Sequence, residues 1–251
     1  MIGPPNIIPA HTSALPKEDL NELDNQTRAI LFDLDGTLID STDLILQCFK
    51  YSWERVCGFS HTRDALVSTF GTPLRSAMHR LMDAANTSGN RSNSAEVDIK
   101  VVDELLTQYR FYNVANHDLL ARPFEDTGEV LIELRCRGYL IGVVTSKSRE
   151  LGLRGLKLCS LDGLIDSAIF LEDTDVHKPH PGPILAALQR LREPSRAAAY
   201  VGDSRHDIVA ARAAGVRSVA ALWGPATRSE LERERPDFIA ESITDLLEIF
   251  H

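Results

Sequence analysis

The chain has 251 residues, 43% of them hydrophobic and 25% charged, which suffices for one large globular domain or one domain with an insertion. Its formal net charge of -9 argues against a nucleic-acid partner, because general nucleic-acid binders carry a basic face. No apolar run approaches the roughly 18 residues that cross a bilayer, and the first residues do not resemble a signal peptide. We therefore expect a cytoplasmic protein with no membrane partner.

The first residues differ in composition from the rest of the chain. Pro4, Pro5, Pro9 and Pro16 are followed by a polar, acidic run, which is typical of a loosely held segment. We interpret residues 1–27 as an N-terminal extension that takes no part in the chemistry.

A short strand and a block of helices follow. The apolar run that ends at Asp33 favours a buried strand, and a Gly-Thr turn comes after it. From Ser41 onward, apolar residues recur every three or four positions, which predicts an amphipathic helix with Ser41 at its N-cap. Further helical patterns cover about residues 63–85, with an interruption at 71–73, and about residues 95–116. No strand pattern interrupts this block.

Strands and helices then alternate to the C-terminus. This order implies βαβ units and a mainly parallel sheet covered by helices on both faces. The predicted fold class is therefore α/β, with a core of residues 28–40 and 121–251 and a helical cap, residues 41–120, inserted after the first strand. The expected core helices cover about residues 125–137, 148–158, 183–192 and 206–214, and the expected strands about 139–145, 167–171, 197–201, 217–222 and a short segment near Phe238.

Two aspartates stand at the end of the first strand, where sheets of this kind bind their ligands. Asp33 and Asp35 lie two positions apart, so the period of a strand directs both carboxylates to one side. Like charges at close range push two pKa values apart, so that one acid can attack while the other carries a proton. Taken alone, the pair is equally typical of a turn before a glycine.

Two later segments add groups that suit a phosphate. Thr145 and Ser146 follow a strand and precede a helix, where free backbone N–H groups and hydroxyls bind phosphoryl oxygens. Lys178 stands between His177 and Pro179 in a stretch whose prolines restrict the backbone, so its ammonium is a candidate to hold the phosphate and the nucleophile together. The ordinary alternatives are a helix N-cap and a solvated surface lysine.

The last segment is acidic. Gly202 and Asp203 end a strand, and Asp207 follows four residues later at the start of a helix. Mg²⁺ prefers a few carboxylates and retains waters, so Asp33, Asp203 and Asp207 are candidate ligands. Helix capping by Asp203 is the ordinary alternative.

In this order, the four segments resemble the four motifs of the haloacid dehalogenase-like hydrolase superfamily over about residues 28–250. The resemblance implies a Rossmann-like core, an aspartyl nucleophile at Asp33 that forms a phosphoaspartate, and a general acid and base at Asp35. It also implies Mg²⁺ as the cofactor, held by Asp33, the backbone carbonyl of Asp35 and Asp203, with Asp207 in support. The expected activity is that of a magnesium-dependent phosphatase acting on a small phosphorylated metabolite.

Within this superfamily, the helical cap and the stretches around Arg122, Lys178 and Trp223 resemble phosphoglycolate phosphatases and cytoplasmic pyrophosphatases. Arg75, in the cap, is a candidate to bind a carboxylate or a second phosphate of the substrate, although an exposed arginine in a weak surface pair fits the same pattern. A pyrophosphatase and a sugar phosphomutase stay open as alternatives. Asp35 argues against a dehalogenase, which needs no second acid, and a non-catalytic regulatory protein is the remaining reading.

Overall fold

The computed structural model describes residues 27–87 and 95–251 of the chain. The predicted extension, residues 1–27, lies outside the described residues except for Thr27. No helix within the described ranges is long and apolar enough to cross a membrane.

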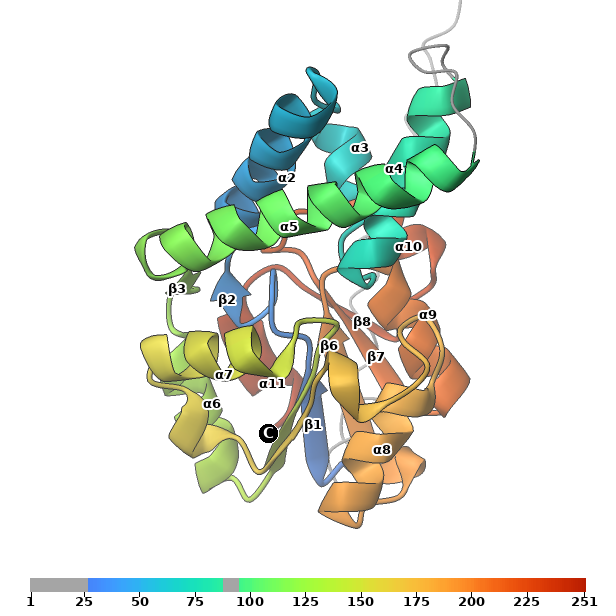
Figure 1. Cartoon of the computed structure of the whole chain (residues 1–251). Coiled ribbons are helices and arrows are strands. Elements are labelled where there is room, and N and C mark those ends of the chain that lie inside the picture. The colour runs from blue at the N-terminus through green and yellow to red at the C-terminus, as the bar shows by residue number, and fades with distance from the viewer. Residues whose placement is uncertain (1–26, 88–94) are drawn as a thin grey trace, which may run out of the picture.

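A six-stranded parallel sheet forms the centre of the molecule (Figure 1). Its strands follow the spatial order β5-β4-β1-β6-β7-β8, and every neighbouring pair is parallel. Continuous apolar runs form these strands because helices cover both faces of the sheet and leave neither face to water. The strands are β1 (Ala29–Phe32), β4 (Leu140–Val144), β5 (Ser167–Ile169), β6 (Ala198–Gly202), β7 (Arg217–Ala221) and β8 (Phe238–Ala240).

The two faces of β1 belong to two separate apolar clusters. Ile30 and Phe32 pack in one cluster, whereas Ala29 and Leu31 pack in the other, as the period of two in a strand requires. The first cluster contains side chains of α6 (Thr127–Cys136), α7 (Arg149–Leu158) and α11 (Leu246–Ile249), and the second contains side chains of α8 (Gly182–Leu191) and α9 (Arg205–Ala214). The remaining core helices are α10 (Arg228–Arg233) and the short 3₁₀ helices η1 (Asp162–Leu164), η2 (Leu171–Asp173), η3 (Ser195–Ala197) and η4 (Ile243–Asp245).

Four helices between β1 and β4 lie beyond one end of the sheet (Figure 1), and we call them the cap helices. They are α2 (Thr42–Cys57), α3 (Arg63–Val67), α4 (Leu74–Thr87) and α5 (Ala95–Leu120), and α2 packs along α5. The connections to and from these helices pair as two antiparallel strands, β2 (Ile39–Asp40) and β3 (Arg122–Pro123). The chain therefore leaves and re-enters the core at one place.

The α/β fold and its parallel sheet agree with the sequence-based prediction, with differences in detail. The predicted interruption separates α3 from α4, and Gly71 takes a left-handed φ of 78° within it. The β2–β3 pair was not predicted, since two-residue strands carry too little periodic signal. Ser41 does occupy the N-cap position of α2, but its side chain makes no capping bond there.

Candidate active site

The candidate site lies at the carboxyl end of β1, where the strand order of the sheet reverses. The strands β4 and β5 lie on one side of β1, and β6 to β8 lie on the other. The connections after these strands run in opposite directions from β1, which leaves a crevice at its carboxyl end. Asp33, Thr145 and Asp203 directly follow β1, β4 and β6. The topology thus gathers three segments that are far apart in the sequence.

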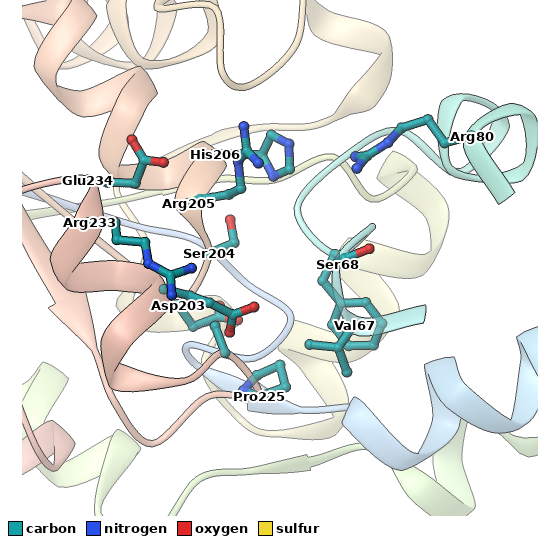
Figure 2. A pocket seen from close by; sticks show the side chains of 13 residues that line it. Val67, Ser68, Arg80, Asp203, Ser204, Arg205, His206, Pro225, Arg233 and Glu234 are labelled. Carbon is teal, nitrogen blue, oxygen red and sulfur yellow. The ribbon is translucent and has the colours of Figure 1, made fainter. Parts of the chain in front are cut away.

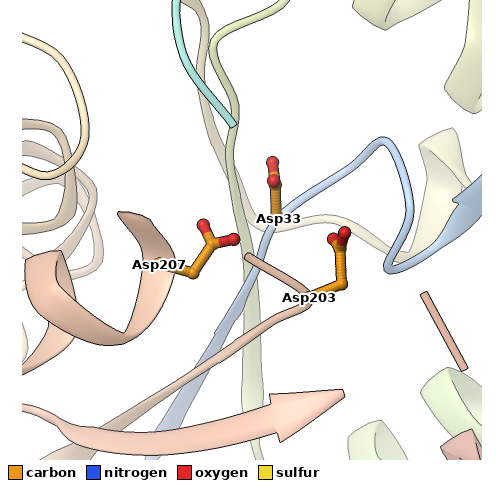
Figure 3. Close-up of side chains that lie close together, drawn as sticks. All are labelled: Asp33, Asp203 and Asp207. Carbon is orange, nitrogen blue, oxygen red and sulfur yellow. The ribbon is translucent and has the colours of Figure 1, made fainter. Parts of the chain in front are cut away.

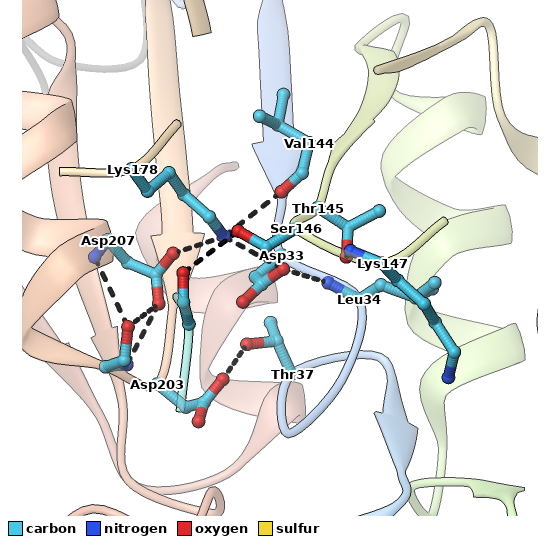
Figure 4. Close-up of polar contacts among 12 residues, drawn as sticks. Asp33, Leu34, Thr37, Val144, Thr145, Ser146, Lys147, Lys178, Asp203 and Asp207 are labelled. Carbon is cyan, nitrogen blue, oxygen red and sulfur yellow. Dashed lines mark hydrogen bonds and ion pairs between the residues drawn. The ribbon is translucent and has the colours of Figure 1, made fainter. Parts of the chain in front are cut away.

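Asp33 is buried and firmly oriented. Its Oδ1 accepts hydrogen bonds from the backbone N–H of Leu34 at 2.7 Å and from Lys178 Nζ at 2.9 Å (Figure 4). Burial raises the pKa of Asp33 to about 7, with Asp207 adding to the rise and Lys178 opposing it. A carboxyl group with such a pKa is partly protonated near neutral pH, and a further cation beside it would favour the charged form.

Lys178 is the ammonium at the centre of the cluster, and only 2% of the residue is exposed. Besides Asp33, its Nζ donates to Asp207 Oδ1 at 2.7 Å, to Tyr200 Oη at 3.0 Å and to the Val144 carbonyl at 3.2 Å. Burial by itself lowers the pKa of Lys178, but the carboxylates of Asp207 and Asp33 outweigh that effect and raise it. The predicted lysine is therefore a buried charge with fixed partners.

Asp203 approaches the same point from β6. Thr37 Oγ1 donates to Asp203 Oδ1 at 2.7 Å, which fixes the carboxyl group. Burial, followed by the charges of Asp207 and Asp33, raises the pKa of Asp203 well above its ordinary value. Gly36 leaves the necessary space, because a Cβ there would lie 2.5 Å from Asp203 Oδ2. Gly36 also has a φ of 85°, which a residue with a side chain rarely adopts.

Asp207 completes the acidic cluster but already has several protein partners. Its Oδ2 accepts from the backbone N–H and the hydroxyl of Ser204, as in a capping box at the start of α9, and its Oδ1 accepts from Lys178 and Tyr200. The ligand atoms of Asp33, Asp203 and Asp207 lie within 4.8 Å of one another (Figure 3). Three buried carboxylates at this spacing suit a hard divalent cation, and the full hydrogen-bonding of Asp207 favours Asp33 and Asp203 as the direct ligands.

Asp35 is partly buried and faces the same cavity as Asp33. Its Oδ1 accepts a hydrogen bond from Ser41 Oγ at 2.5 Å and from Lys147 Nζ at 2.7 Å. Asp33 and Asp35 therefore face one cavity, as their spacing predicted, but each is paired with a different lysine, Asp33 with Lys178 and Asp35 with Lys147.

A cavity of about 160 Å³ lies between the strand ends and the cap helices. Thr145 and Ser146 line it, and Ser146 Oγ also donates to the carbonyl of Gly71, which ties the cap to the core. Arg75 lies on α4 outside the cavity lining, with a half-exposed side chain whose guanidinium is 2.8 Å from Asp103. The cap side of the cavity is formed by Ile45, Phe49, Thr69, Phe70, Gly71, Thr72, Leu74, Ala77, Tyr109, Arg110 and Asn113.

A second cavity, of about 190 Å³, is lined by Asp203 and by residues of the cap, α9 and α10 (Figure 2). Arg80 contributes from the cap side, whereas Arg205, His206 and Arg233 contribute from α9 and α10. The two cavities share Phe70 in the loop between α3 and α4. This loop therefore separates them where the cap meets the core.

Three polar residues of the site had no role in the sequence-based prediction. Tyr200 lies in the middle of β6, and the sequence predicted only a strand there. Its hydroxyl forms hydrogen bonds with both Lys178 and Asp207. Lys147 stands two residues after Thr145, and that short distance from a strand end was the one available signal. Ser41 was read only as an N-cap, because nothing in the sequence indicates its bond to Asp35.

Comparisons with known proteins agree with this geometry. The profile of the family described as "Haloacid dehalogenase-like hydrolase" matches residues 30–221. The "putative pyrophosphatase PpaX" of Caldanaerobacter subterraneus subsp. tengcongensis is 41% identical over 221 residues, which are 88% of this chain and 93% of that protein. Pyrophosphatase PpaX of Anoxybacillus flavithermus is 35% identical over 220 residues, with 88% and 95% of the two chains covered.

The fold agrees with solved structures as well. The crystal structure of a predicted phosphoglycolate phosphatase from Haemophilus somnus superposes with a TM-score of 0.80 at 24% identity, and the match covers 89% of this chain and 98% of the other. The sheet order, the acidic cluster at the strand ends and the sequence matches agree, and the chain belongs to the haloacid dehalogenase-like hydrolase family.

Proposed function

We propose that this chain is a magnesium-dependent phosphatase that cleaves a small phosphate ester or anhydride through a phosphoaspartate on Asp33. The observation that carries the proposal is a buried carboxylate at the end of β1, fixed by Lys178 and open to a cavity between the strand ends and the cap. In this proposal, residues 28–40 and 121–251 are the catalytic core and residues 41–120 are the cap.

The first step transfers the phosphoryl group to the enzyme. A carboxylate oxygen of Asp33 attacks phosphorus, and the bond between phosphorus and the leaving oxygen breaks. The leaving oxygen takes the proton that Asp35 carries. Because Ser41 and Lys147 both bond Oδ1 of Asp35, its Oδ2 is the oxygen that we assign to this proton transfer.

The second step returns the enzyme to its starting state. The carboxylate of Asp35 removes a proton from a water molecule as that water attacks phosphorus. The bond from phosphorus to the Asp33 oxygen breaks, and inorganic phosphate leaves. Asp35 is then protonated for the next turnover, so no other acid or base is required.

The phosphoryl oxygens need partners of positive charge or hydrogen-bond donors during both steps. Lys178, Thr145 and Ser146 are the proposed partners, and the buried position of Lys178 strengthens its attraction for an anion. The carboxylates of Asp33 and Asp203 lie close enough to hold one Mg²⁺ together, and the family resemblance adds the backbone carbonyl of Asp35 as a ligand. A bound Mg²⁺ would neutralise charge on the phosphoryl group and orient it. In this arrangement Asp207 holds Lys178 in place.

The substrate class follows from the cavity and from the relatives. A space of about 160 Å³ admits a phosphoryl group with a compact leaving group. The relatives named pyrophosphatase PpaX support pyrophosphate as a candidate substrate beside a phosphoglycolate-like ester.

The test is phosphate release from p-nitrophenyl phosphate, pyrophosphate and phosphoglycolate with Mg²⁺. We expect turnover that a chelator abolishes, and Asp33→Asn should lower it by at least about a thousandfold while the exposed control Asp43→Asn leaves it unchanged. After an acid quench, mass spectrometry should find one phosphoryl group on the peptide that contains Asp33. Undiminished turnover in Asp33→Asn, or a phosphoryl group on another peptide, would contradict the mechanism.

A further inference from the structure

The cap side of the active-site cavity combines apolar and polar side chains, and two of the polar ones, Arg110 and Asn113, come from α5. Ile45, Phe49, Leu74 and Ala77 provide apolar surface, whereas Arg110 and Asn113 stand three positions apart on α5. Residues at this spacing are neighbours on a helix surface, so the two side chains reach the same part of the cavity.

Asn113 lines the cavity and has a buried polar atom without a partner. The residue is only 3% exposed, its Nδ2 lies 3.6 Å from Cys48 Sγ, and its Oδ1 is buried without a hydrogen bond. Burial raises the pKa of Cys48 to about 12, so this sulfur carries its proton and can donate as well as accept. Turning the amide over would bond Oδ1 to the thiol and leave the N–H₂ group without a partner. In either orientation, the carboxamide keeps one hydrogen-bonding atom for a bound molecule.

Arg110 supplies a charge that no acidic group of the described ranges neutralises. Arg110 is exposed and lines the cavity, and its guanidinium makes no ion pair within residues 27–87 and 95–251. The other arginine considered for this role, Arg75, is engaged by Asp103 and lies outside the cavity lining. On the core side, the ammonium groups of Lys178 and Lys147 are already paired with Asp33 and Asp35. Among the described residues that line this cavity, Arg110 is thus the cation without an acidic partner, and it is available for the far end of a substrate.

We propose that Arg110 and Asn113 determine specificity by binding an anionic group on the leaving half of the substrate, a carboxylate or a second phosphoryl group. This inference rests on the proposed phosphatase function and adds a substrate class to it. The guanidinium of Arg110 donates to the anionic oxygens. With the Asn113 amide turned over, the Cys48 thiol donates to Oδ1 and the N–H₂ group donates to the anion from the buried side. The apolar cap surface borders the buried side of this contact, where Asn113 lies.

Steady-state kinetics with three substrates test the proposal. Pyrophosphate and phosphoglycolate carry a second anionic group, whereas the leaving half of p-nitrophenyl phosphate has none. Arg110→Gln should lower kcat/KM about 10–100-fold for the first two substrates, mainly through KM, and change it less than about twofold for the third. Arg110→Lys should restore part of the loss. The matched control is Arg63→Gln, which removes an exposed cap arginine that lines neither cavity.

The Asn113 variants separate an anion from a neutral group. Asn113→Asp should reduce turnover of both anionic substrates more than Asn113→Leu does, because a carboxylate repels an anion whereas leucine only removes a hydrogen bond. If phosphoglycolate alone responds to these variants, the site takes a carboxylate, and if pyrophosphate alone responds, it takes a phosphoryl group. A neutral hydroxyl as the ligand would instead leave Asn113→Asp as active as the parent, which would overturn the inference.

Three further results would overturn the inference and leave the phosphatase function intact. They are an equal loss for all three substrates in Arg110→Gln, no loss in Arg110→Gln for either anionic substrate, and a selective loss in Arg75→Gln instead. Failure of the parent on every phosphate compound would refute the proposed function itself. In that case calorimetric titration with pyrophosphate and with phosphoglycolate decides the inference. It compares the Asp33→Asn chain with the same chain carrying Arg110→Gln, and equal affinities of the two chains for both compounds would reject the inference.

Discussion

The buried acidic cluster should cost the folded chain stability whenever no cation fills it. Burial, together with the charge of Asp207, raises the pKa of Asp33 from 3.8 to about 7. A carboxyl group whose pKa rises on folding binds its proton more tightly in the folded chain than in the unfolded chain. The stability that it contributes is therefore complete below about pH 4 and is lost as the pH rises through about 7. Asp33→Asn has no proton to lose, so we expect this variant to avoid that loss.

The size of the effect follows from the pKa shift. Each pKa unit corresponds to about 1.4 kcal/mol, so a rise of about three units sets an upper limit of about 4 kcal/mol. Asp203 shares the cluster and releases part of its own repulsion when Asp33 is neutral, so we expect a net gain of about 1–3 kcal/mol at pH 8. Lys178 keeps Asp207, Tyr200 and the Val144 carbonyl as partners, so the substitution does not isolate its charge.

Thermal unfolding followed by circular dichroism in the presence of a chelator provides the assay. For a chain of this size, the expected gain raises the melting temperature of Asp33→Asn by about 2–10 °C at pH 8 and leaves it nearly unchanged at about pH 4. The exposed control Asp43→Asn should follow the parent at every pH. If Asp33→Asn melts at or below the parent at pH 8, or if the difference is the same at both pH values, the account of a strained acidic cluster is wrong.

Three further predictions concern the metal, the turn after β1 and the second acid. Mg²⁺ should raise the melting temperature more at pH 8 than at about pH 5, because it competes with protons for Asp33 and Asp203, whose pKa values are raised. Asp203→Asn should remove this response. An equal response at both pH values would contradict the prediction. Gly36→Ala should lower the free energy of unfolding, measured by chemical denaturation, by about 1–3 kcal/mol and abolish activity. Gly58 has a similar φ but open space around its Cβ position, so Gly58→Ala should lower the free energy of unfolding by about 1 kcal/mol and leave activity intact. Equal losses in the two variants would refute the close approach of Gly36 to Asp203. Asp35→Asn should slow the first step, formation of the phosphoaspartate in a single turnover, by about 10²–10⁴-fold for alkyl phosphates and by less for p-nitrophenyl phosphate, since a good leaving group needs less protonation. A uniform loss in this step would contradict the acid role.

The sequence was sufficient to predict the centre of the site because strand ends are easy to locate. Asp33, Thr145 and Asp203 each follow an apolar run, and the carboxyl ends of parallel strands meet at one edge of the sheet. The sheet itself was predictable for the same reason, since alternating strand and helix patterns leave few topologies open. Lys178 was less certain from pattern alone, because only the fold brings its ammonium to Asp33.

The surroundings of the site could not be predicted to the same depth. The bond from Lys147 to Asp35 joins residues 112 positions apart and depends on the rotamer of a long side chain, which no periodicity encodes. The sequence-based prediction named Arg75 and did not name Arg110, although both occupy helical patterns with polar neighbours. The structure pairs Arg75 of α4 with Asp103 of α5 and brings Arg110 of α5 to the cavity, because α5 packs against both α4 and α2.

The charge balance of the cluster leads to a last prediction, on the order of binding. Three buried carboxylates face one ammonium group, so the cluster without metal is negative when ionised, and it would repel a phosphate dianion. One Mg²⁺ makes the formal charge of the same cluster zero, which removes the repulsion before the phosphate arrives. We therefore expect inorganic phosphate to bind at pH 8 at least about tenfold more tightly with Mg²⁺ than with a chelator, because a difference of about 1.4 kcal/mol already gives that factor. Calorimetric titration measures both affinities, with Asp43→Asn as the control chain. Equal affinities would show that Lys178 and the backbone N–H groups hold the phosphate without help, and the carboxylates would then need another explanation than a metal site.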